Sequence, residues 1–292
     1  MIASQKYYHS LMIFATVLVA SSFPVGAVIA GSLSPSVIML LRFVCAALLF
    51  LPYVMFKNTL SLPSGKRLLQ YSLISLPLAT FFWCMFESLK YTSALNTSAL
   101  YTMVPGITAL YMLLVNREIT GKARTLGLML GTLGAIWIVF RGDYQAAMAL
   151  DFNYGDLVFF IGCLVMAGYN FLVKKLYAGE PMELMTFWVL VSGAGWLLLA
   201  SWGHIFTIEW QSIESEVYLW ILYLSFFSTL VTFFLQQMGI VKIGATNAVA
   251  YSFLTPAFAL LLSILFGVGT FELTVLPGIA LVILAMFIIQ RG

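Results

Sequence analysis

Two ionisable residues, Arg42 and Glu87, stand inside long apolar segments of this 292-residue chain. A charged side chain in the middle of a membrane helix costs ~2.5–3.5 kcal/mol on insertion scales, and it is retained when it faces a cavity, a ligand or an opposite charge. Both residues are therefore candidates for ligand contact or for a gate, and Glu87 is the acidic candidate for proton transfer. The alternatives are an ion pair between helices or, for Arg42, a side chain that reaches the membrane surface.

Aromatic residues accompany these two charges in the same segments. Their rings hold apolar or cationic ligands through stacking and cation–π contacts. Most aromatic residues of membrane helices instead face lipid or form belts at the two interfaces. The aromatic candidates for a ligand site are Phe23, Trp83, Phe86, Tyr101, Tyr169 and Tyr251.

Amide side chains are scarce in the apolar segments and so carry more information. A buried amide is retained when it bonds a neighbouring helix or a ligand. Asn170, Gln236 and Gln237 fit either role. Asn96 and Asn247 are expected to be structural residues that bond near a helix start.

Other binding and catalytic chemistry has no matching motif. No H-E-x-x-H, P-loop or G-x-S-x-G pattern is present, and the two histidines, His9 and His204, lie at the ends of apolar segments. Cys45, Cys84 and Cys163 lie in apolar stretches, which is typical of small buried residues rather than of metal ligands. We therefore expect no catalytic residue, no metal and no cofactor. The absence of a Lys/Arg run argues against binding of nucleic acid.

The composition places these residues in a membrane protein. Hydrophobic residues make up 62% of the chain and charged residues 9%, against roughly 45–50% and 25% in soluble domains. A membrane helix needs ~20 mainly apolar residues. We expect an all-α integral membrane protein, although a cleaved signal peptide is an alternative for the first span. Its ten transmembrane helices are expected near 8–30, 36–56, 68–90, 95–116, 123–141, 155–175, 182–203, 217–240, 245–267 and 271–290.

The chain repeats weakly at an offset of 151 residues. The pattern A-x-N-x-x-A-x5-P occurs at 94–105 and again at 245–256, so that Pro105 corresponds to Pro256. A proline inside a span removes a helix hydrogen bond and marks a bend or a hinge. The paired prolines are the hinge candidates.

Each half of the chain then holds five spans, and an odd number turns the second copy upside down in the membrane. We expect two inverted five-helix repeats, at 1–142 and 155–292, with a site near the midplane between them. The Gly127-x-x-x-Gly131 pattern permits close helix packing. We expect this packing within a monomer, and a dimer interface is the alternative.

Basic residues predict the orientation, because Lys and Arg resist translocation. Only Lys90 and Arg141 fall on the side opposite to the amino terminus. We therefore expect both termini to be cytoplasmic. The eleven basic residues on the terminal side are Lys6, Lys57, Lys66, Arg67, Arg117, Lys122, Arg124, Lys174, Lys175, Lys242 and Arg291.

The chain resembles the drug/metabolite transporter (DMT) superfamily, in particular its ten-helix members with two EamA domains. The resemblance covers nearly the whole chain. It implies a secondary transporter of the bacterial inner membrane, often an exporter of amino acids, metabolites or amphipathic drugs, in which spans 1, 3, 4, 6, 8 and 9 line a central cavity. The residues that carry it are the Pro-opened second span with Arg42, the Ala-Leu-Asn-Thr-Ser-Ala run at 94–99, Asn-Arg-Glu at 116–118, the Gly-rich segment 127–134, and the second copy at 244–256.

We expect a secondary transporter that moves small amino-acid-like or amphipathic metabolites outward across the inner (plasma) membrane by alternating access. A coupling proton or an exchanged solute would drive it. The alternatives are a carrier of organic cations or drugs and an exchanger of phosphorylated metabolites. An intramembrane enzyme or a channel is more remote. The repeats are not symmetric in charge, because Arg42 corresponds to Trp188 in the second half.

Overall fold

The computed structural model describes residues 2–58, 62–92, 94–116, 121–140, 142–143, 145, 153–265 and 273–291, and these contain helices and no strand. Residues 117, 118 and 141, used above, lie outside the described residues. Lys6, Asn96 and Arg291 lie in described helices, but their side chains are outside the described part.

The helices follow one another through short connections. The first half contains α1 (Ile2–Ile29), α2 (Pro35–Lys57), α3 (Gly65–Ser88), α4 (Ala94–Tyr101), α5 (Val104–Asn116) and α6 (Lys122–Val139). The second half contains α8 (Tyr154–Leu176), α9 (Met182–Ile205), η1 (Trp210–Ser212), α10 (Ser215–Ser225), η2 (Phe226–Val231), α11 (Thr232–Ile243), α12 (Ala245–Ala250), η3 (Tyr251–Leu254), α13 (Thr255–Leu265), η4 (Leu273–Val275) and α14 (Leu276–Arg291).

These elements correspond to the ten expected spans. Among the described residues, eight helical segments are long and apolar enough to cross a bilayer. The other two expected spans are the pair α4–α5, which is interrupted at 102–103, and the 18-residue α6. The prediction of an all-α membrane protein is confirmed, and its physical reason is that a helix satisfies its own peptide groups where no water is available.

Local sequence explains where several spans begin. Pro35 occupies the start of α2, where its missing N–H removes no helix hydrogen bond. At the start of α8, the Asn153 side chain accepts from the Asp156 backbone N–H at 3.0 Å, and the Asp156 carboxylate accepts from the Asn153 N–H at 3.1 Å. This capping box ends the long connection between the halves. Gly244 turns the chain from α11 into α12 with a φ of 89°, a conformation that favours glycine.

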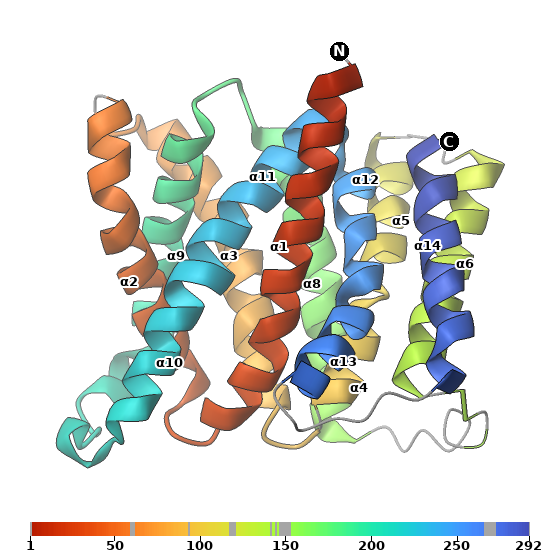
Figure 1. Cartoon of the computed structure of the whole chain (residues 1–292). Helices are drawn as coiled ribbons and strands as arrows, with labels where there is room; N and C mark the ends of the chain where they lie inside the picture. Colours follow the sequence, from red (N-terminus) through yellow and green to blue (C-terminus); the bar gives the residue numbers. More distant parts are fainter. Residues whose placement is uncertain are drawn as a thin grey trace.

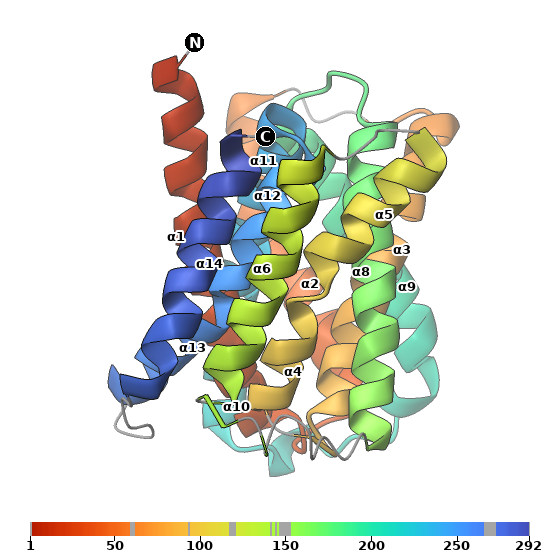
Figure 2. The ribbon, with the colours of Figure 1, turned by 90° about the vertical axis from the view of Figure 1, so that its right-hand side faces the viewer.

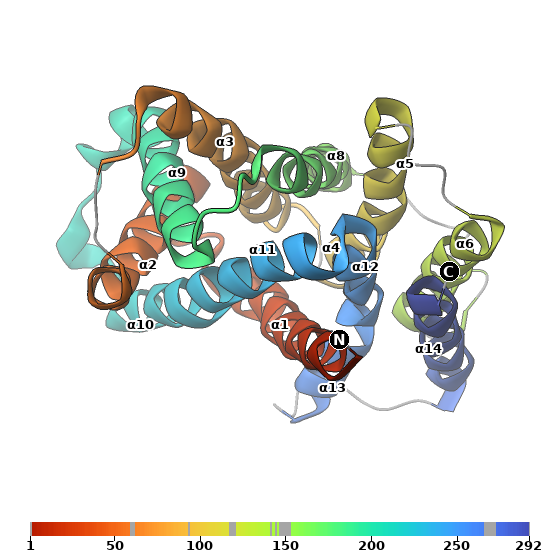
Figure 3. The same ribbon diagram turned by 90° about the horizontal axis from the view of Figure 1, so that it is seen from above.

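The two halves form inverted five-helix repeats. Figure 1 shows both termini at the same edge of the bundle. The five spans from α1 to α6 carry the chain to the opposite edge, where α8, the counterpart of α1, begins. Equivalent helices make equivalent contacts across the two halves. Helix α3 packs on α8, and its counterpart α11 packs on α1. Likewise, α5 packs on α8, and its counterpart α13 packs on α1. The remaining pairs, α2 with α9 and α6 with α14, join equivalent spans of the two halves. Seen from above, they lie toward opposite ends of the molecule (Figure 3).

The interruptions of spans 4 and 9 also obey the repeat. Helix α4 begins at residue 94 and α5 at 104, whereas α12 begins at 245 and α13 at 255, which is the same offset of 151. Pro105 and Pro256 each stand second in the restarted helix. A proline is tolerated there because the first turn of a helix needs no internal donor. Both candidate hinges therefore lie at helix breaks, while their movement stays a prediction.

Glycines set the close approach of α6 and α14, which lie side by side in Figure 2. A Cβ atom on Gly134 would stand 2.8 Å from the Gly278 carbonyl oxygen, and one on Gly278 would stand 2.7 Å from the Gly134 oxygen. At the symmetry-equivalent place, a Cβ on Gly127 would stand 3.1 Å from the Ala285 oxygen. In the Gly127-x-x-x-Gly131 pattern, Gly127 therefore faces α14 and Gly131 faces the Phe253 ring of η3, so both glycines pack within the chain.

We expect Gly134→Ala to destabilise the protein by about 1–3 kcal/mol, because the new methyl group must push two backbones apart. The matched control is Gly195→Ala in α9, where a Cβ meets no atom within 4 Å and alanine gains helix propensity. Thermal unfolding of the detergent-purified variants, followed by tryptophan fluorescence, measures both. Equal melting temperatures for the two variants would contradict the close packing.

Candidate functional site

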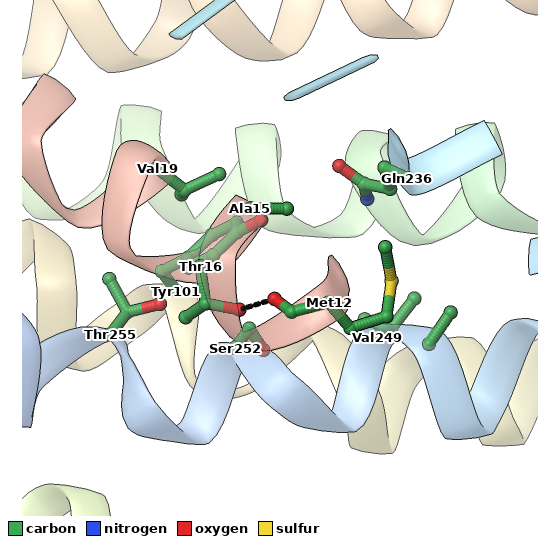
Figure 4. A pocket seen from close by; sticks show the side chains of 10 residues that line it. Met12, Ala15, Thr16, Val19, Tyr101, Gln236, Val249, Ser252 and Thr255 are labelled. Carbon is green, nitrogen blue, oxygen red and sulfur yellow. Dashed lines mark hydrogen bonds between the residues drawn. The ribbon is translucent and has the colours of Figure 1, made fainter. Parts of the chain in front are cut away.

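A cavity lies among the spans at the centre of the bundle. Its wider part is lined by Met12, Ala15, Thr16, Val19, Tyr101, Gln236, Ala248, Val249, Ser252 and Thr255, which come from α1, α4, α11, α12, η3 and α13 (Figure 4). A narrower part adds residues of α3, α8 and η2, and the two parts share Val19, Tyr101 and Gln236. Spans 1, 3, 4, 6, 8 and 9 therefore line these two neighbouring parts, as the resemblance implied.

Hydroxyl groups supply most of the polarity of this cavity. The hydroxyls of Ser228, Ser252 and Thr255 are buried and have no hydrogen-bond partner among the described residues. An unsatisfied buried polar atom costs about 1–3 kcal/mol, so such atoms call for water or a ligand. Within the described part of the chain, no ionised side chain lines either part. The chemistry on offer is hydrogen bonding to a solute, without acid–base groups.

A row of aromatic rings forms the wall of the narrower part. The ring centroids of Tyr101 and Phe81 lie 5.7 Å apart, those of Phe81 and Phe82 4.9 Å, and those of Phe82 and Phe233 5.4 Å. Phe23, predicted from sequence, joins the row at 5.8 Å from Tyr101. Sequence reasoning missed Phe81, Phe82 and Phe233, because a helix that is apolar on all sides gives no signal for its inward face.

Arg42 lies at the end of this row and is fully buried. Its Nε and Nη2 atoms donate to the Thr229 hydroxyl oxygen at 3.2 Å and 2.8 Å. Its guanidinium carbon lies 4.9 Å from the centroid of the Phe82 ring and 5.5 Å from that of Phe86. Thr229 belongs to η2, a π-helical turn, and such turns are frequent at functional sites. Burial excludes the alternative of a side chain that reaches the membrane surface.

The predicted amides form a polar layer between α8 and α11. Gln236 donates to Asn170 at 3.1 Å, and Asn170 donates to Thr108 of α5 at 3.4 Å. The next residue along α11, Gln237, accepts from Thr186 of α9 at 2.6 Å. Tyr169 is also fully buried and lies beside Gln237. The layer connects spans 4, 6, 7 and 8, and only Gln236 in it reaches the cavity.

Tyr251 lies next to the lining residue Ser252 of the wider part. Its hydroxyl bonds the Nδ1 atom of His9 at 2.7 Å, so that η3 is tied to α1. His9 lies one helical turn before Met12, and Tyr251 precedes Ser252, both of which line the cavity. Tyr251 was predicted from the sequence as a residue of the ligand site, whereas His9 was noted only as a residue at the end of a span.

Three other candidates lie away from the cavity. Trp83 is 38% exposed on the outer side of α3. Glu87 forms an ion pair with Lys90 at 2.8 Å, at the end of α3. Asn247 donates to the Ile243 carbonyl oxygen at 3.0 Å, which is a structural contact beside a helix start. Among the described residues, no group of three or more His, Cys, Asp and Glu side chains could hold a metal ion.

The cavity is small in this structure. Its wider part has a volume of about 30 Å³ and its narrower part about 10 Å³. One water molecule needs about 10–15 Å³ of such space, so the site holds a few waters and no metabolite. A solute can therefore occupy it only after the surrounding helices move apart.

Comparison with known proteins agrees with this architecture. The model of the EamA-like transporter family matches residues 6–140 and 153–291. An uncharacterized transporter of Archaeoglobus fulgidus is 24% identical over 86% of both chains. The uncharacterized transporter YyaM of Bacillus subtilis is 26% identical over 63% of this chain, and the match spans 60% of that protein. A crystal structure at 15% identity superimposes with a TM-score of 0.74 over 97% of this chain and 96% of its own, which shows the shared fold.

We expect Thr186→Val to lower stability by about 1–3 kcal/mol, because it removes the donor to the buried Gln237 amide. Thr80→Val is the matched control, since the Thr80 hydroxyl bonds only the Leu76 carbonyl of its own helix at 2.9 Å. Unfolding of both variants in detergent compares them. A loss of stability as large for Thr80→Val would show that the contact between α9 and α11 is unimportant.

Proposed function

Because the chain belongs to the EamA-like transporter family, we propose that it is a secondary transporter that moves small amino-acid-like or amphipathic solutes outward by alternating access. The observation that carries this proposal is the central cavity, which is lined by the same three spans of each inverted half. Inverted repeats around a midplane site suit a protein that opens to either side in turn.

The lining of the cavity supports an amphipathic solute. One end offers hydroxyls from Thr16, Ser252 and Thr255, and the other offers the aromatic wall around Phe81 and Phe82. A solute with a polar group and an apolar body would hydrogen-bond these hydroxyls through its polar group and bury its apolar body against the aromatic wall. Gln236 and Tyr101, which border both parts, would contact such a solute in either orientation.

The repeats at 1–142 and 155–292 are the proposed moving units. Their interrupted spans, at Pro105 and Pro256, offer equivalent places at which one half can bend relative to the other. The α6–α14 contact lies between equivalent spans and joins the halves through glycines. Motion about such a contact would preserve it while the cavity opens.

Coupling to an exchanged solute fits the contacts better than a proton carried by Glu87. The Glu87 carboxylate is paired with Lys90 and lies at the end of a helix. The lining residues that the structure describes include no acidic side chain. An exchange mechanism needs no proton carrier, because the second solute resets the transporter.

The transporter is proposed to lie in the inner membrane with both termini in the cytoplasm. The Lys/Arg distribution supports this orientation, and both ends of the chain lie at one edge of the bundle. We expect Gly65→Cys, at the terminal edge, to resist a membrane-impermeant maleimide on intact cells, and Gln211→Cys, at the other edge, to react. Both positions are exposed. The reverse labelling pattern would overturn the orientation.

A flux assay tests the transport proposal itself. In liposomes that contain the purified protein, we expect saturable uptake and counterflow of at least one of labelled phenylalanine, tryptophan and leucine. Gln236→Leu should reduce uptake about tenfold, the effect of losing roughly 1.4 kcal/mol of solute binding. Gln70→Leu is the matched control, because Gln70 bonds Arg67 and lies outside the cavity lining.

Linear, unsaturable flux in this assay would identify a channel instead. Chemical alteration of the solute would identify an enzyme. Absence of flux for all three compounds would refute the proposed solute class.

A further inference from the structure

The positive charge of Arg42 has no negative counterpart in the interior of the bundle. Among the described residues, the ion pairs are Lys57 with Glu183, Arg67 with Glu180 and Lys90 with Glu87. The buried Asp156 belongs to the capping box of α8 and accepts a hydrogen bond from Thr92 at 2.6 Å. Acidic groups of the described spans therefore lie at helix ends, and none neutralises Arg42.

The contacts of Arg42 leave part of its hydrogen-bonding capacity unused. A guanidinium carries five N–H donors in a planar fork that matches a carboxylate. Two of these bonds go to the single oxygen of Thr229, and a weak contact of 3.8 Å goes to the Met39 sulfur. The Phe82 and Phe86 rings supply cation–π contact but no acceptor oxygen. The two remaining N–H groups have no acceptor among the described residues.

Arg42 lies directly behind the wall of the cavity. Phe82 contacts the guanidinium and also lines the narrower part. Ser228, the neighbour of Thr229 in η2, lines the same part and has an unpartnered hydroxyl. One aromatic ring thus separates an unneutralised guanidinium from the space proposed for the solute. The opening that admits a solute must rearrange this wall in any case.

We propose that Arg42 is the anion-binding residue of the transport site, and that the transported solute carries a carboxylate which pairs with its guanidinium when Phe82 turns aside. This inference rests on the proposed function and narrows its solute class. A carboxylate would accept the unused N–H donors in a bidentate pair and neutralise the buried charge. An organic cation would meet uncompensated repulsion from the same residue, so the charge of Arg42 counts against the cation alternative.

The competing role for Arg42 is purely structural. Its two bonds to Thr229 fasten α2 to the π-helical turn of span 8. A structural role predicts that replacement of Arg42 lowers stability and leaves the charge preference of solute binding unchanged. The charge preference therefore separates the two roles.

The experiment measures the rise in melting temperature of the purified protein against compound concentration. The probes are matched triads with one carbon skeleton and three charges: 3-phenylpropanoate, 3-phenylpropanamide and 3-phenylpropylamine, with the corresponding isobutyl and indolyl triads. Wild type is compared with Arg42→Met and Arg42→Lys. The control is Arg67→Met, the same replacement at a guanidinium that pairs with Glu180 at the terminal edge.

We expect wild type and Arg67→Met to bind an acid about tenfold more tightly than its amide, because the carboxylate forms a charge-assisted pair that the amide cannot form. Arg42→Met should bring this ratio to about one, and Arg42→Lys should retain part of it because lysine lacks the fork. If Arg42→Met does not fold, the acid-to-amide affinity ratios of wild type and Arg42→Lys decide between the two roles of Arg42.

Two results would overturn the inference. The first is binding by wild type of amides or amines alone, which refutes the carboxylate and leaves the transport proposal intact. The second is an unchanged acid preference in Arg42→Met, which assigns Arg42 the structural role. Absence of any shift across all triads, together with absent flux, would refute the proposed function itself.

Discussion

The hydrocarbon interior of a bilayer offers no hydrogen-bond partner, so every peptide group of a spanning segment must be satisfied within the protein. This constraint explains both the helices and the places where they are interrupted. The break after α4, the 3-10 turn η3 and the π-turn η2 each place a residue in the cavity lining: Tyr101, Ser252 and Ser228. Irregular backbone is thus found where water or a solute can reach it.

The two halves share a backbone arrangement, here called the frame, and they differ in the chemistry of their side chains. The breaks at 102–103 and in η3 and the contacts of Gly134 and Gly127 with α14 follow the repeat. The π-turn does not, because its counterpart α3 is a continuous helix, and Arg42 has Trp188 in the equivalent place. The frame is what alternating exposure of a site requires of both halves. The asymmetric features gather on one side of the cavity, where they can recognise one particular group of a solute.

The sequence predicted the frame better than the site. Composition, ten apolar windows and one repeated pattern were sufficient for the class, the spans and their inversion, because the bilayer imposes length and hydropathy directly. Of the candidate residues, Tyr101 and Gln236 border the cavity and Arg42 lies behind its wall. The sequence marks all three because charge, hydroxyl and amide are costly in lipid. The phenylalanine wall was missed, and Trp83 was assigned inward, since rotation of an apolar helix about its axis depends on packing that hydropathy does not record. The importance of His9 depended on a contact with Tyr251, 242 positions away in the chain.

The small volume of the cavity has a physiological consequence. In a membrane that stores energy as ion gradients, a continuous file of water through a protein lets protons and small ions leak unless an electrostatic barrier excludes them. A cavity with parts of about 30 Å³ and 10 Å³ holds only a few waters, too few for such a file. In this shape, the described spans hold too little water in the cavity to pass protons or small ions by that route.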